Sequence, residues 1–280
     1  MYLGVFCSAF FACEEVGPTI ILEEAQVPLV DTSYVSTTPV TAVPKNILFE
    51  EFSGVRCSNC PAGNAETHNL VQTYLNRVIP VTIHSNFLAA PYDDEEDLRN
   101  GDANDIANNL GPVTSKPSCF IDRKIFNGQR LINNPSSWSG LVDAELTQNS
   151  NVELQLEIVD FDVTERTMRY RSTLSFAQTL NDINLGFYIT ESEIFTTQLD
   201  LTVKVANYEH EYVLRKSLTS YLGNPITEDI QPNTIIIKEF EIDLDNFDED
   251  KIWDINHMHV VAFLRQANET IVQAAMANVQ

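Results

Sequence analysis

The sequence predicts an α+β chain of two domains: an α/β domain over residues 46–149, then an all-β sandwich over residues 150–280. The 280 residues are enough for two domains of ordinary size. Strand and helix patterns alternate up to about residue 149, as they do where helices connect parallel strands. Beyond that point strand patterns follow one another at short spacing, which is typical of a sandwich.

Composition restricts the class of protein further. Hydrophobic residues make up 44% of the chain, which indicates a folded core. Lysine and arginine total 17 against 40 aspartates and glutamates, a net charge of −23. Nucleic-acid binding needs a basic patch, so we expect no nucleic acid as a partner. No apolar run is long enough for a transmembrane helix.

The first 13 residues, MYLGVFCSAFFAC, are apolar and are followed at once by two glutamates. This resembles the end of a bacterial lipoprotein signal segment, with Ala12 as the last residue removed and Cys13 as the lipidated residue. The positively charged start of a complete signal is missing, so the segment would be partial. The alternative is an N-terminal core strand with a buried cysteine. A lipid on Cys13 would hold the protein to a membrane without a span.

Residues 14–45 are predicted to be a tether or linker. They contain four prolines and a Ser/Thr-rich stretch, DTSYVSTTPVTAVP. One short strand is expected over residues 19–22. The alternative is that residues 34–43 form an edge strand of one of the domains.

The α/β domain is predicted from apolar runs, helical spacing and helix-start signals. The expected order is β-α-β-α-β-β-α, in which parallel crossovers precede a hairpin. The second helix is expected to begin with an acidic first turn. The segments are strand 46–52, helix 61–77, strand 78–84, helix 94–110, strands 117–122 and 124–132, and helix 137–148.

The sandwich is predicted from about seven strand patterns, with the clearest period-2 alternation at its start. Its expected strands are 152–158, 168–176, 185–190, 212–218, 234–244, 260–265 and 270–277.

Cys57 and Cys60 are the strongest chemical signal. They follow the first predicted strand, and Pro61 favours the first helical turn. A Cys-x-x-Cys between strand and helix is the layout of a thioredoxin-like redox site. Helix N–H groups, the helix dipole and Arg56 would stabilise a Cys57 thiolate, and Cys60 would close a disulfide with it. The alternative is a static disulfide that only fastens the helix start.

Pro117 and Cys119 lie on one predicted strand, on the same face. In thioredoxin-like folds a cis-proline lies at such a strand entry and packs against the cysteines. The resemblance therefore implies a cis bond between Lys116 and Pro117; the alternative is an ordinary trans proline. Cys119 would then lie near the site, as a third redox thiol or as a buried inert cysteine.

His84, Glu50 and Glu51 are further candidates near the cysteines. His84 ends the second strand, at the sheet edge where the ends of parallel strands meet. It could modulate the thiol or accept a proton, or it could be structural. Alternation requires one of Glu50 and Glu51 to face inward, and a buried carboxylate could accept a proton from Cys60.

Two acidic runs, over residues 93–97 and 243–250, carry the oxygen ligands that calcium takes. The second run lacks the glycine and the closing glutamate of an EF-hand loop. We interpret both as solvated loops, and we expect neither a metal nor a cofactor.

The chain resembles the outer membrane protein 28-related lipoproteins of Bacteroidetes, which carry a thioredoxin-like domain before a β-rich domain. The resemblance implies an exported protein, lipid-anchored at the outer membrane and facing the periplasm or the surface. No tryptophan precedes Cys57 and no proline separates the cysteines, although both are usual in thioredoxins. The matching stretches are ILFEEFSGVRCSNCPAGNAE, PVTIHSN, KPSCFIDR, HEYVLR and MHVVAFLRQANETIVQAAMANV.

These observations predict thiol–disulfide exchange with protein thiols or disulfides. Cys57 would attack, Cys60 would resolve, and Pro117 would line the groove for the partner. The alternative is a non-catalytic surface binding or scaffold lipoprotein, in which the cysteine pair is structural and the sandwich binds an unknown surface ligand. In both cases the membrane is reached only through the lipid anchor.

Overall fold

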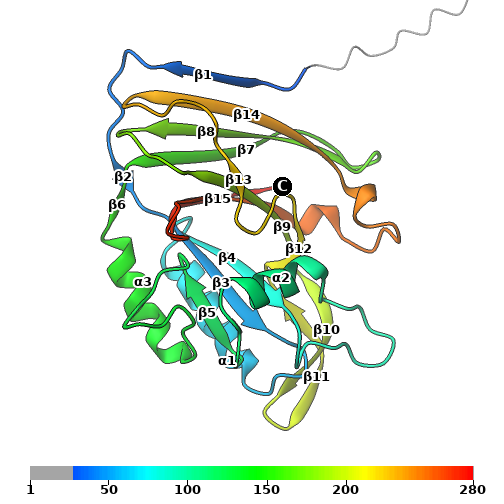
Figure 1. The fold of residues 1–280 in the computed structure, drawn as a ribbon. Helices are drawn as coiled ribbons and strands as arrows, with labels where there is room; N and C mark the ends of the chain where they lie inside the picture. Colours follow the sequence, from blue (N-terminus) through cyan, green and yellow to red (C-terminus); the bar gives the residue numbers. More distant parts are fainter. Residues whose placement is uncertain (1–27, 280) are drawn as a thin grey trace, which may run out of the picture.

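A large mixed sheet forms the centre of the molecule, seen in the computed structural model, which describes residues 28–279 (Figure 1). The signal segment, Cys13 and the strand expected at 19–22 lie outside the described residues. The predicted α+β class is confirmed, with most of the chain in sheets. In spatial order the large sheet contains β16 (Ile271–Asn278), β15 (Met258–Arg265), β9 (Asn184–Glu191), β12 (Val213–Ser217), β4 (Val78–His84), β3 (Ile47–Ser53) and β5 (Ser118–Ile121), with β13 (Asn224–Pro225) paired to β9.

This sheet runs continuously across the division predicted at residue 150. β3 and β4 are parallel and β5 is antiparallel to β3. β12 joins the two parts because it pairs with β4 on one side, through Val213 and Thr82, and with β9 on the other. Separate sheets for the two predicted domains are therefore not observed, because backbone pairing unites them.

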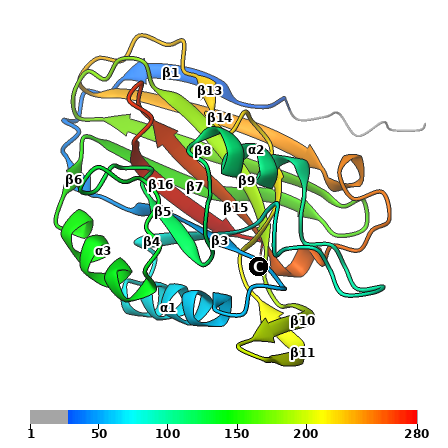
Figure 2. The ribbon, with the colours of Figure 1, turned by 60° about the horizontal axis from the view of Figure 1, so that its bottom comes forward.

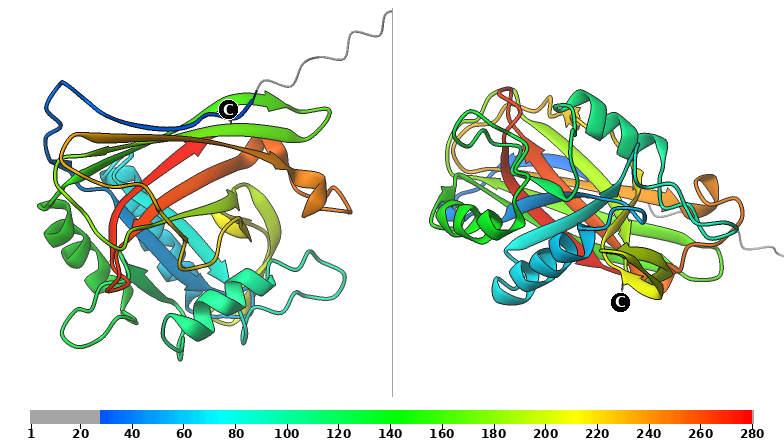
Figure 3. Two further views of the ribbon diagram at one scale, coloured as in Figure 1. Left: turned by 45° about the horizontal axis from the view of Figure 1, so that its top comes forward. Right: turned by 90° about the horizontal axis from the view of Figure 1, so that it is seen from below.

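A second, antiparallel sheet packs over the large sheet and completes a sandwich (Figure 3). The largest core cluster lies between the two sheets, with the rings of Tyr170, Phe187 and Phe240 in mutual contact. Every second residue of β8 is buried in this core, as period-2 alternation requires. In order the second sheet contains β1 (Asp31–Val35), β14 (Thr234–Asp243), β8 (Thr167–Phe176) and β7 (Val152–Asp162).

β1 corrects part of the predicted linker. Residues 31–35 form an edge strand paired with β14, which is close to the alternative of an edge strand over residues 34–43. A further two-stranded pairing, β2 (Val43–Pro44) with β6 (Asn149–Ser150), follows in the same stretch of the predicted linker.

Helices cover both faces of the parallel strands (Figure 2). α1 (Cys60–Thr73) and α3 (Trp138–Leu146) share one core cluster with β3, and α2 (Gly101–Asn109) shares another on the opposite face. Because both faces are covered, every residue of β3 and β4 is buried, as is usual for parallel strands. Short 3-10 helices lie at Pro135–Ser137, Leu244–Asn246 and Ile255–His257.

Three segments differ from their predicted bounds or structure. α2 starts seven residues late because Asn100 caps it, accepting from the Ala103 N–H, so the acidic run stays in a loop. α1 stops at Thr73, and Asn76 follows in the left-handed region at φ 61°. The strand expected over 124–132 is replaced by a turn and two isolated bridges.

The hairpin of β10 (Ile194–Asp200) and β11 (Val203–His210) was not predicted. It projects from the large sheet beside the start of α1 (Figure 2). Most residues of β11 are exposed, so its sequence carries no alternation of buried and exposed positions. A hairpin that lies outside the main sheets gives little periodic signal.

Candidate active site

The candidate site is a disulfide at the first turn of α1. Cys57 and Cys60 are bonded to each other, and the Cys60 N–H donates to the Cys57 carbonyl. Asn59 occupies the cap position without a side-chain cap hydrogen bond, and Pro61 favours the first turn of the helix. Cys57 is only 2% exposed and Cys60 is fully buried. The pair is therefore placed as the sequence predicted, but it is covered.

The peptide bond between Lys116 and Pro117 is cis, and Pro117 lies against the first turns of α1. Gly63 permits this approach. A Cβ at Gly63 would lie 2.6 Å from the Pro117 Cβ and 2.7 Å from a Glu51 carboxylate oxygen. Any larger residue would push the proline or the glutamate away. Gly63 thus brings together the cysteine helix, the cis-proline and Glu51.

Glu51 lies beneath α1, on the face of β3 toward the cysteines. The Thr67 hydroxyl donates to its carboxylate at 2.5 Å, and its side chain is 1% exposed. Burial raises the pKa of Glu51 to about 8, so this carboxyl is neutral at pH 7. With its amide turned to satisfy its neighbours, Asn64 donates to Glu51 Oε1 at 2.8 Å and accepts from the Tyr208 hydroxyl at 3.1 Å.

Glu50 is buried as well, but on the opposite face of β3. Its carboxylate accepts two hydrogen bonds from the Arg123 guanidinium, at 2.7 and 2.9 Å. Tyr188 in β9 accepts from the same guanidinium at 2.6 Å. Glu50 therefore joins the two parts of the sheet and does not reach the cysteines. Of the two predicted glutamates, only Glu51 faces α1.

Cys119 pairs with Glu51 across β5 and β3, and its thiol is free. Burial, with a contribution from Glu51, raises the pKa of Cys119 well above its usual value. A fully buried thiol that stays protonated is a poor nucleophile. This placement favours the inert cysteine over the third redox thiol.

His84 lies on the α1 face of β4, edge to face with His210 of β11, with ring centroids 5.3 Å apart. Burial lowers the pKa of His84 well below its usual value and that of His210 to about 4. Neither nitrogen of His84 has a hydrogen-bond partner among residues 28–279. Because burial lowers the pKa of both side chains, both imidazoles are neutral at pH 7.

Lys116 and Arg56 are held by backbone carbonyls. The Lys116 ammonium donates to the Ser85 and Phe87 carbonyls, and burial lowers its pKa to about 7. The Arg56 guanidinium donates to the Ala90 carbonyl at 2.8 Å and stacks on a tyrosine ring. Both cations flank the cysteine loop, and their polar contacts fasten the loop that follows β4.

The unpredicted hairpin covers the cysteines. The Leu199 N–H donates to the Val55 carbonyl and the Leu201 N–H to the Ser58 carbonyl, both at 2.8 Å. The Gln198 side chain donates to the Cys57 carbonyl at 3.0 Å. β10 thus binds the backbone of the Cys-x-x-Cys loop directly. The apolar Ile194 at the start of the same strand is buried in a small core cluster with Val55.

Beside the disulfide, a cavity of about 290 Å³ lies between α1 and β11. The buried Glu51 carboxyl lines this cavity together with other polar side chains, whereas neither cysteine lines it. Its lining includes Glu51, Asn64, Thr67, Thr82, Tyr208 and His210.

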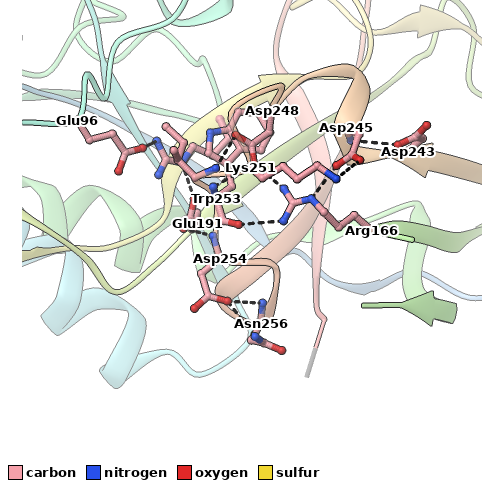
Figure 4. A network of polar contacts seen from close by, with 12 residues as sticks. Glu96, Arg166, Glu191, Asp243, Asp245, Asp248, Lys251, Trp253, Asp254 and Asn256 are labelled. Carbon is pink, nitrogen blue, oxygen red and sulfur yellow. Dashed lines mark hydrogen bonds and ion pairs between the residues drawn. The ribbon is translucent and has the colours of Figure 1, made fainter. Parts of the chain in front are cut away.

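Some carboxylates of each acidic run form ion pairs (Figure 4). Arg166 binds Asp245 at 2.9 Å and Asp248 at 2.5 Å, and Arg215 binds Glu96 and Glu191, both at 2.6 Å. Among residues 28–279, no group of three or more His, Cys, Asp and Glu side chains is arranged to hold a metal. Within the same residues, no helix is both long and apolar enough to cross a membrane.

The fold and the site together define a class: a mixed α+β protein, mostly β-sheet, with a disulfide-bonded Cys-x-x-Cys at a helix start. A family model described as "Outer membrane protein Omp28" matches residues 104–280. The chain belongs to this family. The matched region begins in α2 and contains Pro117 but not the cysteine pair.

Two solved structures share much of the fold. HBP35 of Porphyromonas gingivalis has a TM-score of 0.63 at 17% identity, over 83% of this chain and 74% of that chain. A protein from Agrobacterium tumefaciens has a TM-score of 0.50 at 12% identity, over 82% of this chain and 92% of that chain. A domain of the outer membrane lipoprotein Omp28 from Porphyromonas gingivalis gives 0.30 at 10% identity, over 47% of this chain and 89% of that chain. No curated protein matches.

Proposed function

We propose that this member of the Omp28 family carries a thioredoxin-like site and exchanges thiols and disulfides through Cys57 and Cys60. One arrangement supports the proposal: the disulfide at a helix start, a cis-proline against that helix and a neutral glutamate beneath it. The thioredoxin-like interpretation also draws on the parallel β3 and β4, the antiparallel β5 and helices on both faces.

Exchange from the disulfide form requires attack on Cys57. A partner thiolate attacks the Cys57 sulfur, the Cys57–Cys60 bond breaks, and Cys60 leaves with the electron pair and takes a proton from Glu51. A second partner thiolate then attacks the partner's sulfur in the mixed disulfide and releases the Cys57 thiolate, which the helix N-terminus stabilises. The partner loses two electrons and the pair gains them.

The reverse direction uses the same groups. The Cys57 thiolate attacks a partner disulfide, Glu51 as carboxylate accepts the proton of Cys60, and the Cys60 thiolate resolves the mixed disulfide. Pro117 lines the groove for the partner in both directions. The partners would be protein thiols or disulfides, met at the outer membrane, where a lipid on Cys13 would tether the chain.

A second candidate function is a non-catalytic surface scaffold. It is favoured by the near-complete burial of both sulfurs and by the hydrogen bonds from β10 to the cysteine loop. In this case the disulfide fixes the loop for the hairpin, and the sandwich binds or presents a surface ligand.

Glu51→Gln should slow exchange while stabilising the fold. In the direction that starts from the Cys57 thiolate, we expect single-turnover exchange to fall by about a hundredfold and the rise of rate near pH 8 to disappear, because glutamine cannot accept the proton of Cys60. The measurement is the rate against pH for wild type and variant. Glu66→Gln on the same helix is the matched control. A profile that is unchanged in Glu51→Gln would exclude Glu51 as the acceptor of the Cys60 proton.

The stability effect has the opposite sign. Glu51 holds its proton up to about pH 8 in the folded state but loses it near 4.5 when unfolded. The stability that the protonated Glu51 carboxyl contributes is therefore fully present below about pH 4.5 and is lost as the pH rises to 8. The whole difference in the free energy of unfolding is roughly 5 kcal/mol. The glutamine variant should be more stable than wild type above pH 8, by urea unfolding.

A further inference from the structure

Lys45, Asp122 and Glu145 form a buried polar cluster at the opposite end of β3 from the cysteines. Lys45 precedes β3, Asp122 follows β5, and Glu145 lies in α3. The Lys45 ammonium nitrogen lies 2.7 Å from Asp122 Oδ2 and 3.5 Å from Glu145 Oε2. The three side chains are 11%, 0% and 7% exposed. None of them takes part in the proposed exchange of thiols and disulfides.

This lysine differs from the other lysines that pair with a carboxylate. Within residues 28–279, the side chains of those other lysines are at least 20% exposed. The buried ion pairs of Arg123 and Arg215 contain guanidinium groups, which stay protonated and are not nucleophiles. A lysine amine that is removed from water is a nucleophile once its ammonium has lost a proton. Lys45 and Asp122 therefore combine a nucleophile and an acyl group at contact distance.

The two oxygens of the Asp122 carboxyl have different surroundings. Oδ1 accepts from the Leu48 N–H at 2.9 Å. Oδ2 has no hydrogen-bond partner within residues 28–279, because the Lys45 nitrogen, 2.7 Å away, lies off the direction of a hydrogen bond. The nitrogen thus lies beside the carboxyl group, where one oxygen is fixed by the backbone and the other is free to leave.

The cluster also provides the proton transfers that an amide bond requires. Burial raises the pKa of the Asp122 carboxyl to about 6, so the carboxylic acid is accessible close to neutral pH. A buried ammonium and carboxylate can exchange a proton to become an amine and a carboxylic acid, because burial disfavours both charges. The second oxygen of Glu145 is held by the Lys124 ammonium at 2.7 Å, which leaves Oε2 for Lys45.

We propose that Lys45 and Asp122 form an intramolecular amide bond, with Glu145 as the acid–base group. After the proton exchange, the Lys45 amine attacks the Asp122 carboxyl carbon. Glu145 takes one proton from the attacking nitrogen and delivers it to Oδ2, and the bond between Cγ and Oδ2 breaks as water leaves. The new bond joins Nζ to Cγ, and Oδ1 keeps its hydrogen bond to Leu48. The reaction is a condensation without electron transfer, so it needs no oxidant, reductant or cofactor.

The surroundings of the cluster suit this reaction. A cavity of about 420 Å³ is lined by both Lys45 and Glu145, and it gives the released water a route out. The bond would close a covalent loop that contains β3, the cysteines and β4. Such a loop restricts the unfolded chain, so it stabilises the fold whether or not the cysteines exchange.

Intact-mass spectrometry of the full chain, denatured and with its disulfide reduced, tests the bond. Wild type should be lighter than its sequence by the mass of one water. Lys45→Arg keeps a cation that cannot be acylated, and Glu145→Gln removes the acid–base group, so both should have the full mass. Lys216→Arg is the matched control. It alters an exposed pair with Asp102 and should lose the water as wild type does.

Tryptic digestion locates the bond, and thermal unfolding measures its effect. Trypsin should not cut after Lys45, and it should release one branched peptide that joins the segment ending at Arg56 to the segment containing Asp122. Lys45→Arg should unfold about 10 °C below wild type, because its unfolded chain is not cross-linked.

Three outcomes would overturn the proposal. The first is a wild-type chain of full mass that trypsin cuts after Lys45. The second is a loss of water that persists in Lys45→Arg, since another group would then have reacted. The third is a bond that forms completely in Glu145→Gln, which would exclude Glu145 as the acid–base group.

Discussion

Replacing Arg123 with alanine should lower the free energy of unfolding by about 3–5 kcal/mol. Arg123 is fully buried and donates to Glu50, to the Tyr188 hydroxyl and to the Tyr221 carbonyl, the last at 2.7 Å. Its guanidinium also lies 4.8 Å from the centre of the Phe263 ring. Without it, the Glu50 carboxylate is left buried with no opposite charge, and three partners from different parts of the chain lose their common contact.

Urea unfolding at pH 7 checks this prediction. Arg99→Ala is the control, since Arg99 pairs with Asp97 at the surface and its loss should cost less than about 1 kcal/mol. The double variant Glu50→Gln/Arg123→Met should recover part of the loss, because it leaves no unpaired charge. A change in Arg123→Ala as small as that in Arg99→Ala would show that the buried pair does not join the sheet.

Cys57→Ser should reduce thiol–disulfide exchange about a thousandfold or more, to the background rate, because the attacked sulfur is lost. Cys60→Ser should instead trap a mixed disulfide between Cys57 and a partner, since no resolving thiol remains. Cys119→Ala is the control and should keep wild-type activity, as its buried thiol stays protonated.

An insulin-reduction assay, a thiol-oxidation assay and mass spectrometry of the trapped adduct measure these effects. Equal activity in wild type and Cys57→Ser would contradict exchange at this site and favour the scaffold function.

Strands with a buried face could be predicted closely from the sequence. β4 has the predicted bounds, and β8 differs by one residue, because continuous apolar runs and strict alternation both report burial. α2 was misplaced because the acidic residues before it resemble a first helical turn. The helix in fact starts after Asn100, whose side chain caps it. The sequence offers two helix-start signals, and tertiary contacts of the loop decide between them.

The single sheet that joins the two predicted domains could not be predicted from the sequence. β12 reads as an ordinary sandwich strand, and only its pairing with β4 places it between the parallel strands and β9. The β10–β11 hairpin also escaped prediction because β11 is mostly exposed and because two of the buried positions in β10 are the polar Thr196 and Gln198. Long-range pairing of this kind leaves no local signal in a single sequence.

The chemical site was predictable to the extent that its signals are local. Such local signals are the spacing of Cys57 and Cys60 and the position of Pro117 at a strand entry. In the structure Pro117 lies against Gly63, in the helix that begins at the cysteines. The roles of Glu50 and Glu51 were not separable, since alternation sends one to each face and both faces are covered.

The reduction potential of the Cys57–Cys60 pair tests the exchange function most directly. It is measured by equilibrating the full chain in glutathione or dithiothreitol buffers and quantifying free thiols. An exchange-active pair should give a value between about −270 and −120 mV, the range of thioredoxin-like oxidoreductases. A value below about −300 mV, typical of structural disulfides, would contradict exchange and assign the pair to the scaffold.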